Sequence, residues 1–393
     1  MERLSLVEKH IQTPKEVVIV AAGRSPLGAF RGNLSELNAT DLAAQTLSGT
    51  LAKYKVPPQA IEMLYLGNVY SANLGQSPAK QVAVKAGLPP STVCVNMNKV
   101  CSSGMVALTT GYMDILLGNC DTVAVGGVDV MSAVPLYQYK GSQAKPTDGM
   151  IKDGLWDAKY NVHMGECAER CADKYGVSKQ RMDEFSQKTI EKAHSAWEAG
   201  KFQREIVPVV KQDGNSVAKD QLKPANQNFS KMRTVFRKQG GRVTAGNASP
   251  LSDGAAMLVL TTRSKAQEMG WSVLGKLENF AHAEQDNVEF TTSPNLAVRK
   301  LLEKTQVNIN QVDLFELNEA FAVVGIVNTD LLGVDPQKVN VYGGAIALGH
   351  PLGCSGARIV VTLLSALRQE NKKLGVAGIC NGGGGGSAVL VSF

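Results

Sequence analysis

Short apolar runs alternate with amphipathic segments along the first part of the chain. The stretch "EVVIVAAGRSPLG" at 16–28 predicts a buried strand that ends in a turn, and "ATDLAAQTLSGTLAKY" at 39–54 predicts an amphipathic helix. A strand at 62–69, a helix at 76–86 and a strand at 91–98 follow in the same manner. This alternation predicts an α/β fold whose sheets are covered by helices.

The sequence contains an internal repeat. The stretch that begins "VNMNKVCSSG" at 95 is matched by "VNVYGGAIALGHPLGCSG" from 339. Each copy has a Val-Asn strand, a Cys-Ser-Gly turn, a helix, and an apolar strand that ends in glycines. A duplicated α/β half-molecule fits this pattern, with chemistry at the two corresponding helix starts. Chance similarity between α/β units is the alternative.

Residues 131–248, between the two halves, have a different character. They are more polar, with charged helices such as "SKQRMDEFSQKTIEKAHSAWEAGKF" and a turn-rich piece, "KQDGNSVAKDQLKPANQNFS". We interpret them as an insertion from the first half that covers a site.

Composition narrows the class of protein. The 393 residues are 44% hydrophobic and carry a net charge of +6, without any Lys/Arg block typical of a nucleic-acid tail. No apolar run approaches the ~20 residues that span a bilayer. We therefore expect a globular protein without nucleic-acid or membrane partners, whose mild positive charge suits a small anionic substrate. Seven cysteines, an odd number, predict free thiols in a reducing compartment.

Cys101 and His350 are the first candidates for chemistry. In "NKVCSSGMVAL" at 98–108, Cys101 lies where a helix begins, and the helix dipole there favours a thiolate. A packed small hydrophobe is the alternative. His350 lies between Gly349 and Pro351, in a rigid loop that would hold its imidazole in one orientation.

Two further segments offer polar groups. Cys380 ends an apolar strand and opens a five-glycine run at 382–386, whose N–H groups are predicted to be free for a substrate oxygen. The alternative is that these glycines form a tight corner between sheets where no side chain would fit, and both interpretations can hold. In "FELNEAFA", Asn318 on its own is predicted to be the N-cap of a helix.

A metal site is not predicted. His163, Cys167 and Cys171 are spaced i, i+4, i+8, so on one helix the outer two lie ~12 Å apart at ~1.5 Å per residue. Zinc ligands lie about 2.0–2.3 Å from the ion. The sequence also lacks the P-loop and the G-x-G-x-x-G dinucleotide pattern, which argues against a nucleotide-binding oxidoreductase.

Six segments together resemble the thiolase family, and more closely its biosynthetic acetoacetyl-CoA members. They occur in family order and are "NKVCSSG", "HMGECAE", "GNASPLSDGAA", "NEAFA", "GGAIALGHPLGCSGAR" and "CNGGGG". The resemblance implies a thiolase fold, in which two duplicated βαβαβαββ halves pack as a layered αβαβα core with an inserted loop domain. We expect the N-terminal half at 1–130 and 249–273, the loop domain that covers coenzyme A at 131–248, and the C-terminal half at 274–393.

This resemblance implies the reversible condensation of two acetyl-CoA molecules to acetoacetyl-CoA and CoA. It makes Cys101 the nucleophile that becomes acetylated, and His350 the group that takes its proton. It makes Cys380 the base for the α-carbon of the second acetyl-CoA. A thiolate is both a good nucleophile and a good leaving group, and an enolate needs a base and fixed donors. Two thiols and one imidazole supply these without a metal or cofactor.

The remaining site residues are also implied by the resemblance. Asn318, through a held water, and His350 would stabilise the oxygen of the thioester or its enolate. The backbone N–H groups of Cys101 and Gly382 would form a second oxyanion hole. Ser249 and His163 match positions that line the channel for the pantetheine arm of coenzyme A.

The family further implies coenzyme A thioesters as substrates and a homodimer or homotetramer. The loop at 139–148 is shorter than the tetramerisation loop of many relatives, which leaves the tetramer less supported. Potassium-responsive members carry a tyrosine in the segment before "TVF". The corresponding stretch here, "QLKPANQNFSKMR", has none, which argues against a potassium site.

Three alternatives and the location complete the predictions. A degradative 3-ketoacyl-CoA thiolase would use the same residues, but "HMG" at His163 favours the short-chain type. Ketoacyl synthases lack an equivalent of Cys380, and a non-catalytic acyl-CoA or lipid-binding protein would be expected to have lost a reactive residue.

At the N-terminus, Arg3-Leu4-x5-His10 resembles a peroxisomal signal, although Ile11 departs from it. Peroxisome and cytoplasm are both open, and the acidic residues there make a mitochondrion less supported.

Overall fold

Strands from both ends of the chain form one hydrogen-bonded sheet in this computed structural model, which describes residues 15–393. The targeting prediction at residues 3–11 lies outside the described residues. The N-terminal strands are β1 (Val17–Arg24), β2 (Gly28–Ala29), β3 (Met63–Gly67), β4 (Val93–Met97), β5 (Thr122–Val130) and β12 (Ser252–Thr262). The C-terminal strands are β13 (Gly275–Glu284), β14 (Leu314–Leu317), β15 (Leu374–Asn381) and β16 (Gly385–Ser392).

The two halves repeat one strand order. From the edge inward the first half runs β4-β3-β5-β12-β1, and the second runs β14-β15-β16-β13. In each half the outer pairs are parallel and the inner pairs antiparallel. The halves meet where β1 pairs with β13, through Val18 with Lys276 and Ile19 with Gly275. The predicted duplication is therefore visible in the sheet itself.

One predicted strand is wrong. The Val-Asn pair at 339 was expected to form a strand like that at 95, yet Val339 makes only an isolated bridge to Phe315. Asn340 has a φ of 46° and Gly343 a φ of 77°, so the chain turns away directly after the bridge. The counterpart of β4 is thus reduced to one residue.

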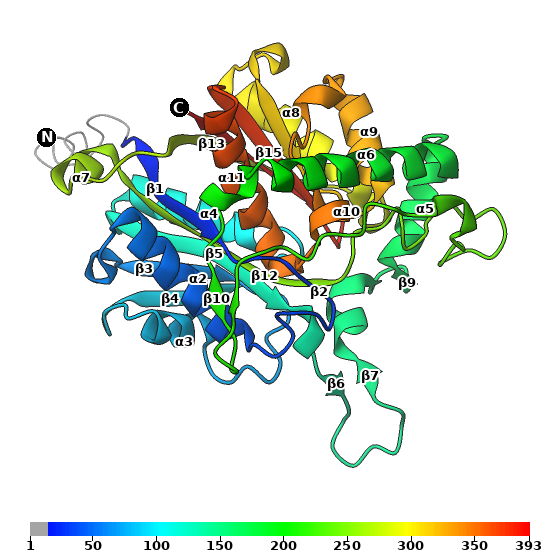
Figure 1. Cartoon of the computed structure of the whole chain (residues 1–393), viewed down its shortest axis with the longest axis horizontal. Helices are drawn as coiled ribbons and strands as arrows, with labels where there is room; N and C mark the ends of the chain where they lie inside the picture. The colour runs from blue at the N-terminus through cyan, green and yellow to red at the C-terminus, as the bar shows by residue number, and fades with distance from the viewer. Residues whose placement is uncertain (1–14) are drawn as a thin grey trace, which may run out of the picture.

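Helices separate and cover the strands. They are α2 (Ala39–Tyr54), α3 (Pro78–Lys85), α4 (Ser103–Leu117), α7 (Arg263–Glu268), α8 (Ser293–Thr305), α9 (Ala322–Leu332), α10 (Ala345–Leu348) and α11 (Leu352–Gln369). Helices α4 and α11 pack against each other and against strands of both halves, at the centre of the molecule (Figure 1). Helices α2 and α8 cover the outer faces of the first and second halves. The predicted α/β fold with a layered αβαβα core is confirmed.

The polar region between the halves forms its own excursion. Its elements are β6 (Leu136–Tyr137), β7 (Thr147–Asp148), β8 (Trp156–Asp157), β9 (Val162–His163), α5 (Met164–Lys174), α6 (Lys179–Glu198), β10 (Val209–Val210) and β11 (Ser216–Val217). The β6–β7 hairpin projects from the body of the molecule (Figure 1), whereas α6 packs against α9 and α10. Within the described residues, the window Val100–Leu117 is long and apolar enough to cross a membrane by length and composition alone. Most of that window is buried, because it contains the central helix α4.

Candidate active site

A cavity of about 460 Å³ lies where the two halves meet the inserted region. Five of the seven predicted site residues line it, namely Cys101, His163, Ser249, His350 and Gly382. The other two, Asn318 and Cys380, are fully buried and do not line it. Cys101 and Gly382, which are 281 positions apart in the sequence, therefore lie at the same cavity.

Cys101 sits in a strained turn at the start of α4. It directly precedes Ser102, the N-cap residue, and follows Val100, a β-branched residue with a φ of 47°. The Ser103 hydroxyl closes this turn, since it accepts from the Lys99 N–H at 2.8 Å and donates to the Val100 carbonyl at 2.6 Å. The predicted position of Cys101 at a helix start is confirmed.

The protonation state of Cys101 differs from the prediction. Burial raises the pKa of Cys101 to about 12, although hydrogen bonds from the N–H groups of Gly382 and of Cys101 itself oppose that rise. The prediction that the helix dipole makes a resting thiolate is wrong, because the cost of burying the charge exceeds these favourable contacts. The thiol must lose its proton during attack, to a base nearby.

His350 is held as a neutral base. Its Nδ1 lies 2.6 Å from the Ser355 hydroxyl, which itself donates to the Pro351 carbonyl at 2.8 Å. A Ser355 hydroxyl that donates to Pro351 accepts from Nδ1–H, so Nε2 carries the lone pair, which accepts from the Asn318 side-chain amide N–H at 3.4 Å. Burial, with a smaller contribution from Arg358, lowers the pKa of His350 to about 3. The sequence analysis missed Ser355; the signal available was a hydroxyl in the first turn of the helix that follows His350.

Asn318 does not cap a helix, so that prediction is wrong. Helix α9 begins at Ala322 with Phe321 as its N-cap residue, while the Asn318 N–H donates to the Gly378 carbonyl at 2.9 Å. This bond extends the β14–β15 pairing by one residue and turns the side chain inward. Its Oδ1 is buried and has no hydrogen-bond partner among the described residues, so it is available to a bound group.

Cys380 lies at the end of β15, with no exposed surface. Burial raises its pKa well above the ordinary value, and the neighbouring Cys101 raises it further. The two thiols are thus close enough to interact electrostatically. Both are neutral before substrate binds, so Cys380 must give up its own proton before it can act as a base.

The five-glycine run is not a row of free N–H groups. Gly385 and Gly386 pair with β15 as part of β16, and Gly384, with a φ of 96°, forms the turn. A Cβ on Gly384 would lie 2.1 Å from the Gln285 carbonyl oxygen, so the packing interpretation holds there. Only the Gly382 N–H is directed at the Cys101 sulfur.

His163 and Ser249 lie on the wall of the cavity. His163 is the N-cap residue of α5, and its Nδ1 accepts from the Gly165 N–H at 3.0 Å, so Nε2 carries the proton. Its ring stacks on Phe236 with centroids 4.7 Å apart. The Ser249 hydroxyl donates to the Ala320 carbonyl at 2.9 Å. Among residues 15–393, no group of three or more His, Cys, Asp or Glu side chains is arranged to hold a metal ion.

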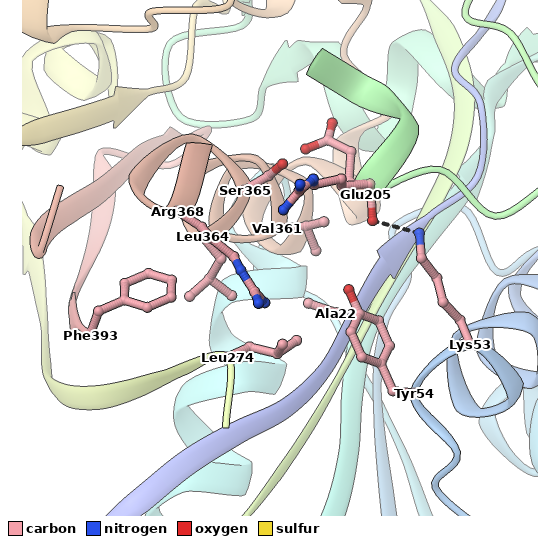
Figure 2. A pocket seen from close by; sticks show the side chains of 11 residues that line it. Ala22, Lys53, Tyr54, Glu205, Leu274, Val361, Leu364, Ser365, Arg368 and Phe393 are labelled. Atoms are coloured by element: carbon pink, nitrogen blue, oxygen red, sulfur yellow. Dashed lines mark hydrogen bonds between the residues drawn. The ribbon is translucent and has the colours of Figure 1, made fainter. Parts of the chain in front are cut away.

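A second pocket, of about 300 Å³, lies elsewhere (Figure 2). Figure 2 shows Lys53, Tyr54 and Arg368 around it, with apolar walls that include Leu274 and Phe393. It shares no lining residue with the cavity around Cys101 and contains none of the predicted site residues. It is therefore not part of the catalytic arrangement.

Family descriptions match both halves of the chain. "Thiolase, N-terminal domain" matches residues 17–264, and "Thiolase, C-terminal domain" matches residues 271–393. The described fold and the matched regions agree, since the boundary between the two matches falls between β12 and β13.

Curated relatives and solved structures extend this similarity over nearly the whole chain. Acetyl-CoA acetyltransferase 2 of Arabidopsis thaliana is 46% identical, over 97% of this chain and 98% of its own length. Acetyl-CoA acetyltransferase of Saccharomyces cerevisiae is 45% identical, over 96% and 99%. The Acat5 thiolase of Ascaris suum, solved in complex with coenzyme A, superposes with a TM-score of 0.92 at 39% identity, covering 96% of this chain and 100% of that one.

Proposed function

The chain belongs to the thiolase family, and we propose that it is an acetyl-CoA C-acetyltransferase, which condenses two acetyl-CoA molecules reversibly to acetoacetyl-CoA and CoA. The observation that carries this proposal is that Cys101 and His350 line one cavity, with Asn318 against His350 and Cys380 near Cys101 in the core beside it. Relatives at 42–46% identity that carry this name support it. The substrates are thioesters of coenzyme A, and no cofactor is needed for the steps below.

The first half-reaction transfers an acetyl group to Cys101. The Cys101 sulfur attacks the thioester carbonyl while its proton passes to Nε2 of His350, whose lone pair meets the Asn318 amide only across a long contact of 3.4 Å. A neutral thiol beside a neutral imidazole avoids a buried ion pair before substrate arrives. The N–H groups of Cys101 and Gly382 stabilise the oxyanion, and the departing CoA thiolate takes the proton from His350.

The second half-reaction forms the carbon–carbon bond. The Cys380 thiol first passes its proton to Nε2 of His350, and the resulting thiolate removes a proton from the α-carbon of the second acetyl-CoA, so that negative charge develops on the thioester oxygen. The protonated His350 donates to that oxygen through Nε2–H, and Asn318, whose Oδ1 has no hydrogen-bond partner among the described residues, acts on it through a held water. The enolate carbon then attacks the acetyl group, and Cys101 leaves as a thiolate and takes the proton from His350. Cys380 keeps the proton of the α-carbon, so both thiols and the imidazole are neutral again.

The cavity suits a long, thin, amphipathic ligand. Apolar side chains such as Met164, Phe236 and Leu251 form much of its lining. The Nε2–H of His163 is free to donate a hydrogen bond to an amide carbonyl of the pantetheine arm. We place this arm along the wall that contains His163 and Ser249.

A homodimer is the assembly that we propose. Strand β4 is one edge of the sheet, and its Val93 and Val95 are 52% and 38% exposed. An exposed apolar edge strand is a surface for pairing with another strand. Light scattering coupled to size exclusion would report a mass about twice 41.8 kDa for a dimer.

The experiment that tests the function compares substrates. Thiolysis rates with acetoacetyl-CoA and with a long-chain 3-ketoacyl-CoA are measured under the same conditions. The proposal expects acetoacetyl-CoA to be preferred in kcat/KM by about tenfold or more. Preference for the long chain would instead assign a degradative 3-ketoacyl-CoA thiolase.

A further inference from the structure

The second pocket, which Figure 2 shows, lies where separate parts of the chain meet. Its lining includes Lys53 and Tyr54 from the end of α2, Arg204 from the insertion, Leu274 from the turn before β13, and Arg368 from the last turn of α11. Its volume of about 300 Å³ is at the lower end of the range for pockets that hold small molecules, about 300–1,000 Å³. The pocket therefore has room for a small ligand.

Three cations surround this pocket without a carboxylate bound to any of them. None of the ion pairs among residues 15–393 includes Lys53, Arg204 or Arg368. The one acidic side chain in the lining, Glu205, accepts from Nε of the buried Arg24 at 2.6 Å. Even with the Glu205 charge counted in full, positive charges in the lining exceed negative side-chain charges by two.

Hydrogen-bond donors also outnumber acceptors at this pocket. The hydrogen bond drawn in Figure 2 runs from Lys53 Nζ to the backbone carbonyl of Arg204, so it uses an acceptor of the wall. Burial raises the pKa of Tyr54, and the positive charges of Arg368 and Arg204 oppose that rise, so both guanidinium groups act on the Tyr54 hydroxyl. A guanidinium group has five N–H donors and no acceptor. The pocket thus offers several donors to an acceptor that a ligand must supply.

The rest of the wall is apolar. It consists of buried Ala22, Leu274, Val361 and Leu364, together with the ring of Phe393. Figure 2 shows the Phe393 ring and the Lys53 ammonium group at opposite ends of the pocket. A ligand that is negative at one end and apolar at the other would match both parts of the wall.

We propose that this pocket binds a small amphipathic anion, with a carboxylate or phosphate head group on a short hydrocarbon chain. Arg204 and Arg368 hold the head group, because the planar guanidinium fork matches two oxygens of such an anion. The chain lies against Leu274, Leu364 and the Phe393 ring. The pocket shares no lining residue with the catalytic cavity, so this inference does not rest on the proposed function.

The first experiment measures thermal unfolding of the full-length protein with a set of probes. Octanoate and octyl phosphate carry both a head group and a chain, octanol lacks the charge, and acetate and inorganic phosphate lack the chain. At equal ionic strength and below micelle formation, octanoate or octyl phosphate should raise the Tm along a saturating curve, because a ligand that binds only the folded state stabilises it. The larger response of the two identifies the preferred head group. No response to either, or an equal response to octanol, acetate or inorganic phosphate, would overturn the inference.

The second experiment locates the ligand with variants of the two arginines. Arg204→Gln and Arg368→Gln each remove one guanidinium group from an exposed position, and the matched control is Arg31→Gln, an exposed arginine that lines neither pocket. The apparent affinity for the stabilising probe should fall about tenfold or more in either pocket variant, the size expected from one lost charge-assisted hydrogen bond. Arg31→Gln should bind like the wild type. Equal affinity of both pocket variants and the wild type would contradict the proposal.

Coenzyme A separates this pocket from the catalytic cavity, whose lining is also largely apolar. The Tm response to the probe should persist in saturating coenzyme A, since the two pockets share no lining residue. A response that disappears in coenzyme A but remains in both arginine variants would place the probe in the catalytic cavity and overturn the inference. Failure of the wild type to cleave acetoacetyl-CoA, with the arginine-dependent response intact, would count only against the proposed function.

Discussion

The hydroxyl of Ser355 decides which nitrogen of His350 acts as the base, and Ser355→Ala tests this. In the wild type, Ser355 donates to Pro351 and accepts from Nδ1–H, so Nε2 keeps its lone pair. Without the hydroxyl, Nδ1–H has no partner in a site where His350 is only 5% exposed. An unpaired buried donor costs about 1–3 kcal/mol. The alternative tautomer avoids this cost but protonates Nε2 and removes the base.

We therefore expect Ser355→Ala to lower kcat by about 5- to 150-fold, since 1.36 kcal/mol corresponds to a factor of ten. Initial rates of acetoacetyl-CoA thiolysis give kcat and KM separately, and KM should stay within about twofold because Ser355 does not line the cavity. The control is Ser365→Ala on the same helix, whose hydroxyl accepts from the Gln369 side chain and which lies at the second pocket, away from the catalytic cavity. If Ser355→Ala retains kcat within twofold of the wild type, the assignment of the tautomer to Ser355 is refuted.

Three further predictions concern the catalytic groups. Cys101→Ser should keep the fold but lose turnover by about 10³-fold or more, because serine is a far poorer nucleophile and leaving group. Mass spectrometry should find no acetyl adduct on this variant after exposure to acetyl-CoA. An unchanged adduct would assign acylation to another thiol. Cys380→Ser should still be acetylated but exchange the α-protons of acetyl-CoA very slowly, so exchange of deuterium at the wild-type rate would exclude Cys380 as the base. Because burial lowers the pKa of His350 to about 3, its neutral form persists to well below pH 6. The kcat/KM should therefore not fall as the pH is lowered from 7 to 6. A fall in kcat/KM with a midpoint near pH 6.5 would contradict the described environment of His350.

Local patterns in the sequence were sufficient for the individual elements. The amphipathic period at 39–54 matches α2 at Ala39–Tyr54, and the apolar run after Glu16 matches β1. These elements follow from side-chain periodicity and from caps such as Asn38, whose side chain accepts from the Thr40 N–H. The repeat in the sequence likewise predicted two related halves, and the strand order of the sheet bears this out.

Contacts between distant residues decided what local pattern could not. Asn318 follows a strand and precedes a helix, as an N-cap would, but its N–H pairs with Gly378 and its side chain turns toward His350. The Val-Asn pair at 339 has the composition of a strand, but the turn at Asn340 ends it. In both cases a feature that the local pattern does not specify, the hydrogen bond to Gly378 or the turn at Asn340, outweighs a weak local preference for a helix cap or a strand.

The electrostatics of the site were also set by tertiary structure. The sequence places Cys101 at a helix start, where the dipole favours a thiolate, yet desolvation in the assembled core raises its pKa to about 12. In the sequence, Lys223 is one cation in a polar loop. Only the fold brings the backbone carbonyls of Ala245, Gly246 and Ala248 within hydrogen-bond distance of its Nζ. The sequence alone determined which reactive groups are present and which segments carry them. Their burial and their partners depend on contacts across hundreds of residues, so only the tertiary structure decided their protonation and their orientation.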